Sequence, residues 1–176
     1  MPELPEVETV CIALSKIVKS SLIIETNLIR NDLRWRVKDS IKKTLENDTL
    51  KRPFRRGKYI LVPTAKDNVL LIHLGMSGHI KIQELIDETQ DNLVKHDHFK
   101  LIIRSKNKKK YSIIYNDPRR FGYIDLFKSK DLEKHFLLKK LGVEPLEKNL
   151  TVDYLYNVFR KKLRNIKSAL LDQSII

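Results

Sequence analysis

The chain has 176 residues, enough for one ordinary domain and the beginning of another. Its 35 lysines and arginines outnumber the 22 aspartates and glutamates, and the net charge of +13 predicts a polyanionic partner, with nucleic acid as the first candidate. The sequence has no run of about 18 apolar residues and no basic amphipathic helix with a wide apolar face, which argues against a membrane partner and predicts a soluble protein.

The N-terminal part alternates between helical and strand-like patterns. Apolar residues recur at helical spacing from Glu6 to about Lys19 and predict an amphipathic helix, and a second, short helix is expected around Lys38–Glu46. The helical stripe of the first segment includes Cys11, the single cysteine, which is expected to be a buried small hydrophobic residue. β-branched and aromatic residues predict strands at Leu22–Arg30, Tyr59–Pro63, Asn68–Leu74, His79–Gln83, His98–Arg104 and Tyr111–Tyr115. The fold class is therefore predicted to be α+β, with antiparallel sheets packed face to face as a sandwich and flanked by helices.

Three polar segments lie between these strands. Glu84–Lys95 is acidic and has no periodic apolar face, which predicts a loop or hairpin connection that does not contact DNA. The basic run Lys106–Lys110 is expected to form a solvated hairpin turn, although it could also touch phosphate. A metal site is not predicted at His96 and His98, because the two rings would share a strand face without a third ligand.

The pattern becomes helical after Phe127. Helices are expected at Asp131–Leu141 and from Thr151 to about Leu163, with a turn at Gly142–Pro145 between them. We therefore predict a first domain over 1–130, a linker with a short helix over 131–149 and a second, helical unit over 150–176.

The first residues, Met-Pro-Glu-Leu-Pro-Glu, outline a covalent active site. Removal of the initiator methionine would expose Pro2 as a secondary amine beside Glu3 and Glu6. An α-amino group titrates around pH 7.7 to 8.0, so a nucleophilic fraction exists at neutral pH and can form an iminium with a sugar carbon. In the alternative interpretation, Pro2 and Pro5 only preset the first turn of a helix whose positive end the glutamates favour. For this string alone the alternative is favoured.

Four sequence motifs, which follow one another in this order along the chain, favour the covalent active site over the helix-start interpretation: MPELPEVETV at 1–10, RRGKY at 55–59, HLGMSG at 73–78 and NDPRRFG at 116–122. Together they resemble formamidopyrimidine-DNA glycosylase, a family of bacterial enzymes that remove oxidised purines (8-oxoguanine, formamidopyrimidines) and nick the resulting abasic site. The resemblance implies a catalytic β-sandwich domain followed by an incomplete helix-two-turn-helix domain over 150–176. It also implies a cytoplasmic, nucleoid-associated location, double-stranded DNA with oxidised purines or abasic sites as the partner, and a monomer on the DNA.

The resemblance assigns roles to the catalytic candidates. The Pro2 amine attacks C1′ of the damaged nucleotide, Glu3 protonates the sugar ring oxygen, and Glu6 positions the opened sugar. Lys58 and Lys167 match family lysines near the lesion, and β,δ-elimination then cleaves the strand on both sides of the sugar.

Further residues are implied to hold the DNA. Met76 and Arg119 would enter the vacated base stack, with Arg119 facing the orphaned cytosine and Phe121 as a wedge beside it. From the residues alone, Met76 could instead be a core residue, but its place between Gly75 and Gly78 favours an exposed loop tip.

The backbone contacts are implied to come from Lys58 and His73, which would bind the phosphates flanking the lesion. A surface lysine and a satisfied core histidine are the alternatives. Arg120, with Arg55 and Arg56, is a weaker candidate for the same electrostatic surface.

Two departures from the family limit these expectations. The family's structural zinc needs a C-terminal four-cysteine finger that is absent here, so no cofactor is expected in this chain, and DNA binding is expected to be weak and sensitive to salt. Two other functions stay open: an endonuclease VIII-like glycosylase for oxidised pyrimidines, which HLGMSG and NDPRRFG disfavour, and an inactive truncated remnant that acts only as a basic DNA-binding module.

Overall fold

The computed structural model describes residues 2–86, 93–160 and 162–176. These residues divide into two compact units, one ending at Lys130 and the other starting at Asp131. In this described part of the chain, no helix has the length and apolar character needed to cross a membrane. The elements of the first unit are α1 (Leu4–Val18), β1 (Ser21–Leu28), α2 (Ile41–Leu45), β2 (Thr49–Leu50), β3 (Phe54–Arg56), β4 (Tyr59–Pro63), β5 (Asn68–His73), β6 (His79–Leu85), β7 (Asp97–Arg104), β8 (Lys110–Asn116) and β9 (Tyr123–Lys128).

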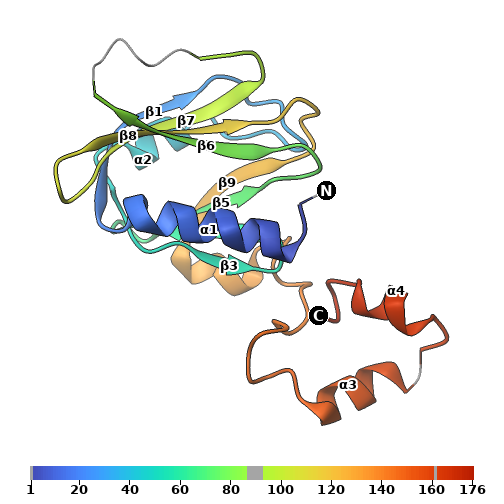
Figure 1. The fold of residues 1–176 in the computed structure, drawn as a ribbon. Helices are drawn as coiled ribbons and strands as arrows, with labels where there is room; N and C mark the ends of the chain where they lie inside the picture. Colours follow the sequence, from blue (N-terminus) through green and yellow to red (C-terminus); the bar gives the residue numbers. More distant parts are fainter. Residues whose placement is uncertain (1, 87–92, 161) are drawn as a thin grey trace. The chain divides into compact units, whose positions relative to one another are not determined.

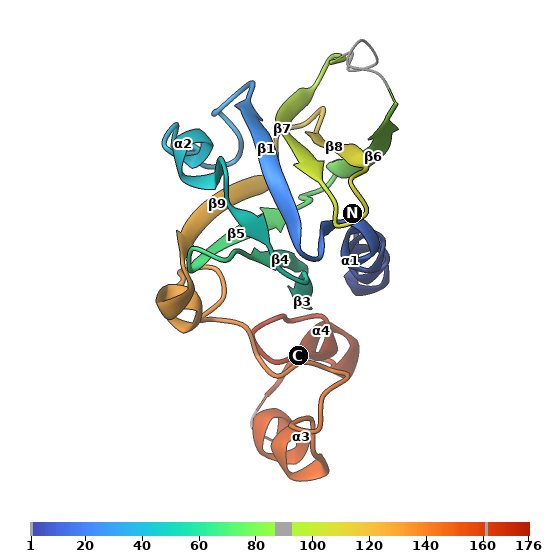
Figure 2. The same cartoon turned by 90° about the vertical axis from the view of Figure 1, so that its left-hand side faces the viewer.

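The first unit is a sandwich of two antiparallel sheets, drawn one above the other in Figure 1. Among the described residues, one sheet has the strand order β2-β1-β7-β8-β6 and the other the order β3-β4-β5-β9. Helices α1 and α2 lie on opposite sides of the sandwich, as Figure 2 shows. The predicted fold class, α+β with an antiparallel sandwich flanked by helices, is confirmed.

The core lies between the sheets, where alternate residues of each strand point inward. Ile60 and Val62 of β4 and Leu70 and Ile72 of β5 are buried there, as expected from the two-residue period of strand side chains. α1 covers one side with four residues spaced three or four apart: Val7, Cys11, Leu14 and Val18. Cys11 is buried as predicted, and this burial raises the pKa of its thiol to about 11.

All six predicted strands are present, but β2, β3 and β9 were missed. β2 has two residues and β3 three, too few for an alternating pattern to be recognised. β9 follows directly on the NDPRRFG motif and pairs with β5 from Asn68↔Lys128 to His73↔Tyr123. The predicted turn between β7 and β8 is present at Lys106–Lys109, and Lys110 already begins β8. Within Glu84–Lys95, Glu84 and Leu85 belong to β6, and residues 87–92 lie outside the described residues.

The second unit contains two short helices, α3 (Val152–Phe159) and α4 (Ile166–Leu170), after the 3₁₀ turn η2 (Ser129–Lys134), which spans the boundary. Thr151 caps α3, because its side-chain oxygen accepts a hydrogen bond from the Tyr154 amide at 3.1 Å. The helix predicted over 131–141 is wrong. The amide of His135 bonds to the carbonyl three residues earlier, and so does that of Leu138, which is 3₁₀ geometry.

The chain leaves this segment at Gly142, whose amide donates to the Gln173 carbonyl at 2.8 Å. A side chain at position 142 would collide with the backbone of Ile175, so only glycine fits this approach. The Tyr154 hydroxyl also donates to the Ile175 carbonyl, at 2.8 Å. These contacts join α3 and the last residues into one unit. The further division into a linker and an incomplete helix-two-turn-helix domain stays a prediction.

Candidate nucleic-acid interface

The N-terminal carboxylates lie at the start of α1. Glu3 is the N-cap residue, and its amide donates to the Glu6 carboxylate at 2.9 Å. The helix-start interpretation is therefore confirmed for Pro5 and the glutamates, which lie at the positive end of the helix. Pro2 precedes the helix, so the helix-start interpretation does not account for it, and its role as the attacking amine stays a prediction. Met1 lies outside the described residues, so its removal stays a prediction.

Lys58 lies against the N-terminus in space although it is far away in sequence. Its ammonium nitrogen is 2.5 Å from Oε2 of Glu3, and its side chain is 15% exposed. The turn at Gly57 (φ +55°), between β3 and β4, brings Lys58 to this position. Lys58 is thus no solvated surface lysine, and the structure places two predicted site residues in direct contact.

Arg55 fixes α1 onto the same strand. Its Nε donates to the Glu8 carboxylate at 2.8 Å and its Nη1 to the Gly57 carbonyl at 2.8 Å. The Arg55 side chain is only 7% exposed. The expectation that Arg55 contributes to the electrostatic surface is wrong, because its buried guanidinium binds Glu8 and the Gly57 carbonyl and so holds α1 in place.

His73 ends β5 directly opposite Tyr59 of β4, and the two ring centroids are 4.8 Å apart. Burial lowers the pKa of His73, and the charges of Arg34 and Lys58 lower it further, to about 4. The ring is therefore neutral at pH 7. A neutral imidazole still offers one N–H donor, which is enough to hold a phosphate oxygen.

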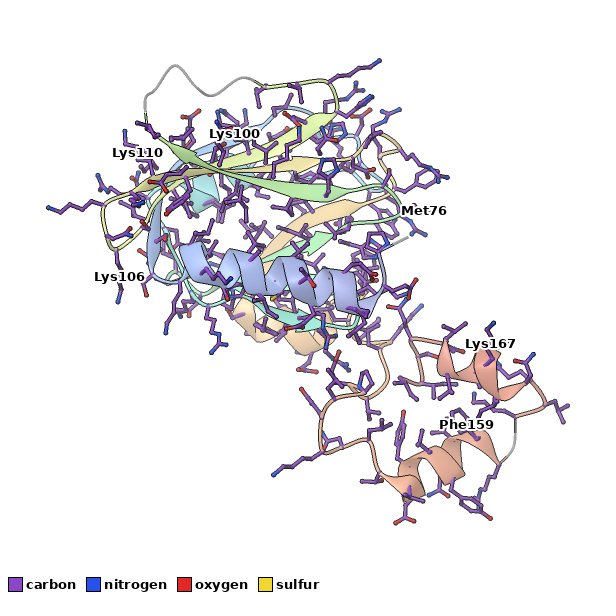
Figure 3. All side chains as sticks on the ribbon, viewed as in Figure 1. Met76, Lys100, Lys106, Lys110, Phe159 and Lys167 are labelled. Atoms are coloured by element: carbon purple, nitrogen blue, oxygen red, sulfur yellow. The ribbon has the colours of Figure 1, made fainter. Side chains whose placement is uncertain are left out.

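Met76 lies at the tip of the turn that joins β5 to β6 and is 45% exposed, so the predicted loop tip is confirmed. Gly75 permits the turn with φ +62°. Figure 3 shows Met76 at the opposite end of the sandwich from Lys106 and Lys110, so that basic turn lies away from the candidate site.

Arg119 and Phe121 lie on the loop between β8 and β9, and Phe121 is 44% exposed. The guanidinium carbon of Arg119 lies 4.6 Å from the centroid of the Phe121 ring, a cation–π contact that holds the pair together in solvent. A planar cation on an exposed ring next to an exposed thioether is suited to a stack of bases.

A hollow of about 660 Å³ connects these residues. Its wall includes five of the residues predicted to hold DNA, but not Lys58, Arg55 or Arg56. The charge of Lys58 nevertheless acts on His73. The lining residues are Asp32, Leu33, Arg34, His73, Gly75, Met76, Arg119, Arg120 and Phe121.

Sequence reasoning missed Asp32 and Arg34, which reach this hollow from the loop after β1. The Arg34 amide donates to the Gly122 carbonyl at 3.2 Å. Its guanidinium carbon lies 4.7 Å from the Trp35 ring centroid. The available signal was the single tryptophan of the chain within a run of arginines, RNDLRWR at 30–36.

Arg120 is less available than predicted. It forms an ion pair with the Asp32 carboxylate, which also accepts two hydrogen bonds from Arg30, at 2.9 and 2.8 Å. Hydrogen bonding from Arg30 and the charges of both arginines lower the pKa of Asp32 to about 2. Asp32 therefore stays ionised and offsets part of the positive charge at this edge of the hollow.

Lys167 lies in α4 and is exposed. It belongs to the second unit, and its role near the lesion stays a prediction. Within the described ranges, no group of three or more His, Cys, Asp or Glu side chains could hold a metal ion. His98 has a structural role, since its Nε2 lies 2.8 Å from the Asp117 carbonyl.

The fold and this hollow define a basic, two-sheet sandwich protein with an acidic, proline-bearing N-terminus. Residues 1–124 match the formamidopyrimidine-DNA glycosylase N-terminal domain. The formamidopyrimidine-DNA glycosylases of Bartonella quintana and Vesicomyosocius okutanii are 42% and 41% identical over the whole chain. A crystal structure of Lactococcus lactis Fpg in complex with DNA containing an abasic site has a TM-score of 0.85 and 30% identity, and covers 99% of this chain and 62% of that one.

The chain therefore belongs to the formamidopyrimidine-DNA glycosylase family. It spans 62% of the length of the Bartonella quintana relative and 61% of the Vesicomyosocius okutanii one. With one cysteine among its 176 residues, it does not fit the four-cysteine zinc site that the family resemblance implies, and no step is assigned to a metal.

Proposed function

We propose that this protein acts in base-excision DNA repair as a bifunctional DNA glycosylase and AP lyase for oxidised purines. The observation that carries the proposal is the meeting of Glu3 and Lys58 at one end of the sandwich, next to a hollow that carries His73, Met76 and Arg119. Solved relatives support it, since they are described as Fpg bound to DNA with an abasic site or with an N7-benzyl-Fapy-dG.

The chemistry starts at Pro2, once Met1 is removed. The proline nitrogen attacks C1′ of the damaged nucleotide and forms a bond to it, while the bond from C1′ to the base breaks. The base leaves with the electron pair of that bond and takes up a proton from water. The proton that the amine loses passes to the neighbouring Glu3, which gives it to the sugar ring oxygen as the ring opens, and an iminium between Pro2 and C1′ remains. Lys58, 2.5 Å from Glu3, holds this carboxylate in place, and Glu6 orients the opened sugar.

The DNA must bend and release one nucleotide before this attack is possible. Met76 and Arg119 occupy the vacated space, and Phe121 separates the neighbouring bases. His73 and Lys58 bind phosphates that flank the lesion, and Lys167 assists recognition or catalysis. The positive charge of the chain supplies the sequence-independent part of the binding energy.

Reduction with borohydride in the presence of an abasic duplex tests the proposal, because it traps an iminium as a stable adduct. The adduct is expected with the native chain and with Pro5→Ala, a matched control in which a proline of the same N-terminal motif is replaced, and it is expected to be lost in Pro2→Gly. Equal trapping by Pro2→Gly would contradict the mechanism. Excision of an oxidised pyrimidine in place of 8-oxoguanine would assign the protein to the endonuclease VIII-like branch, and binding without any adduct would leave only a DNA-binding module.

A further inference from the structure

Asp117 is a fully buried residue in the loop that carries Arg119 and Phe121. Its two carboxylate oxygens accept four hydrogen bonds from the protein. Oδ1 accepts from the Ser77 hydroxyl at 2.5 Å and from the Arg119 amide at 3.2 Å. Oδ2 accepts from the Gly122 amide at 2.8 Å and from the Tyr115 hydroxyl at 3.2 Å. A buried carboxylate needs such a set of donors, because its desolvation is otherwise very costly.

Three of the four donors lie on or next to the residues that would enter the DNA. Ser77 follows Met76, the Arg119 amide belongs to Arg119 itself, and Gly122 follows Phe121. The Arg119 amide also lies 3.3 Å from the Ser77 hydroxyl. One carboxylate therefore ties together two loops, which are about 40 residues apart in sequence.

Two glycines allow the loops to approach so closely. A side chain at Gly75 would collide with the backbone of Phe121 and Gly122, and one at Gly122 would collide with the Tyr115 hydroxyl. The Asp117 backbone is itself anchored to the sandwich, because its carbonyl lies 2.8 Å from His98 Nε2 and its amide donates to the His96 carbonyl at 3.0 Å. Asp117, which we call the clamp, is thus fixed through its backbone to the start of the central strand β7 and through its carboxylate to both loops.

Met76 and Phe121 need hydrogen bonds from neighbouring residues to hold their loops in position. Met76 and Phe121 are each almost half exposed, so burial contributes little to holding them in position. A loop that is ordered before binding avoids the entropy cost of becoming ordered within the DNA.

We propose that Asp117 is a positioning residue that locks the Met76 turn and the Arg119–Phe121 loop into one preformed unit for filling the vacated base stack. The inference rests on the proposed function. Asp117 acts through the three residues that touch DNA and takes no part in the covalent chemistry.

The test measures the rate of borohydride trapping with an abasic duplex for Ser77→Ala and Met76→Ala, each alone and then combined. Ser77→Ala removes one bond to the clamp and is expected to slow trapping about tenfold, the size of one charge-assisted hydrogen bond. If the clamp acts through Met76, adding Ser77→Ala to Met76→Ala should slow trapping by less than about twofold. Ser105→Ala is the matched control, since that hydroxyl also bonds within a turn between strands, to the Lys109 carbonyl at 2.9 Å.

A second measurement is independent of catalysis. Hydrogen exchange should be about tenfold faster at one or both of the Arg119 and Gly122 amides in Asp117→Asn than in the native chain, because the two amides donate to different carboxylate oxygens and asparagine keeps only one of them. Native-like trapping by Ser77→Ala, in a chain whose native form gives the adduct, would overturn the clamp and leave the proposed function standing. If the native chain gives no adduct, the proposed function fails. The amide exchange then decides on the clamp, and unchanged rates in Asp117→Asn would refute it.

Discussion

His73 makes the stability of the protein depend on pH in a predictable direction. Its pKa is about 4 in the folded chain, against an ordinary value of 6.5. As the pH falls below 6.5, the unfolded chain gains a proton that the folded chain accepts only near pH 4, so stability is lost across this window. The slope is about 1.4 kcal/mol per pH unit, so the loss between pH 6.5 and 5.0 approaches about 2 kcal/mol.

Urea denaturation at pH 7.5, 6.0 and 5.0 isolates this contribution when the native chain is compared with His73→Gln. Glutamine keeps a polar group but does not titrate, so the variant should lose less stability on acidification, by about 2 kcal/mol at pH 5. Carboxylates titrate in both proteins and cancel in the difference. His79→Gln, at an exposed position on β6, should behave like the native chain. Parallel pH profiles of the native chain and His73→Gln would refute the inference that His73 is half-buried and neutral.

Three further predictions follow from the same contacts. Arg55→Ala should lower the free energy of unfolding, measured by urea titration, by about 2 kcal/mol, because it leaves a guanidinium-sized gap and an unpaired carboxylate on α1. The control is Arg36→Ala, which should change the free energy of unfolding by less than about 0.5 kcal/mol because the Arg36 side chain is 78% exposed. Gly122→Ala should cost at least about 2 kcal/mol by overpacking against the Tyr115 hydroxyl, and an unchanged thermal midpoint would contradict this geometry. Asp32→Asn should strengthen DNA binding in fluorescence anisotropy and steepen the dependence of log K on log salt by up to about 0.9, because it leaves the charge of Arg120 unmatched at the hollow; weaker binding would show that Asp32 has a different role.

Much of the sandwich could be predicted from the sequence because its strands are rich in β-branched residues. The segments 59–63 and 68–74 are rich in apolar residues, which occupy both faces of an extended strand. The structure has β4 and β5 at these positions. The pattern failed where tertiary contacts decide. The segment 131–141 has helical spacing, but the chain forms 3₁₀ turns there and then docks Gly142 against the C-terminal residues. β9 was not predicted because its place in the sheet is set by its pairing with β5, a contact between segments far apart in sequence.

The candidate site was predicted in its members but not in its connections. Motif resemblance identified Met76, Arg119 and Phe121, and the structure places them around one hollow. Nothing in the sequence pairs Lys58 with Glu3, because sequence separation carries no information about an ion pair across two elements. The same applies to Asp117. The sequence shows it only as a member of the NDPRRFG motif, but its carboxylate accepts hydrogen bonds from two loops.

Net charge alone does not decide where DNA binds, because many cations of this chain are matched by carboxylates. Lys81 pairs with Asp97 and Lys109 with Glu84. At the hollow, two guanidinium groups are instead held by aromatic rings, Arg34 by Trp35 and Arg119 by Phe121. A ring fixes the position of a cation without cancelling its charge. The hollow can therefore present well-positioned positive charge to phosphates and bases, which supports the proposal that DNA binds at this end of the sandwich.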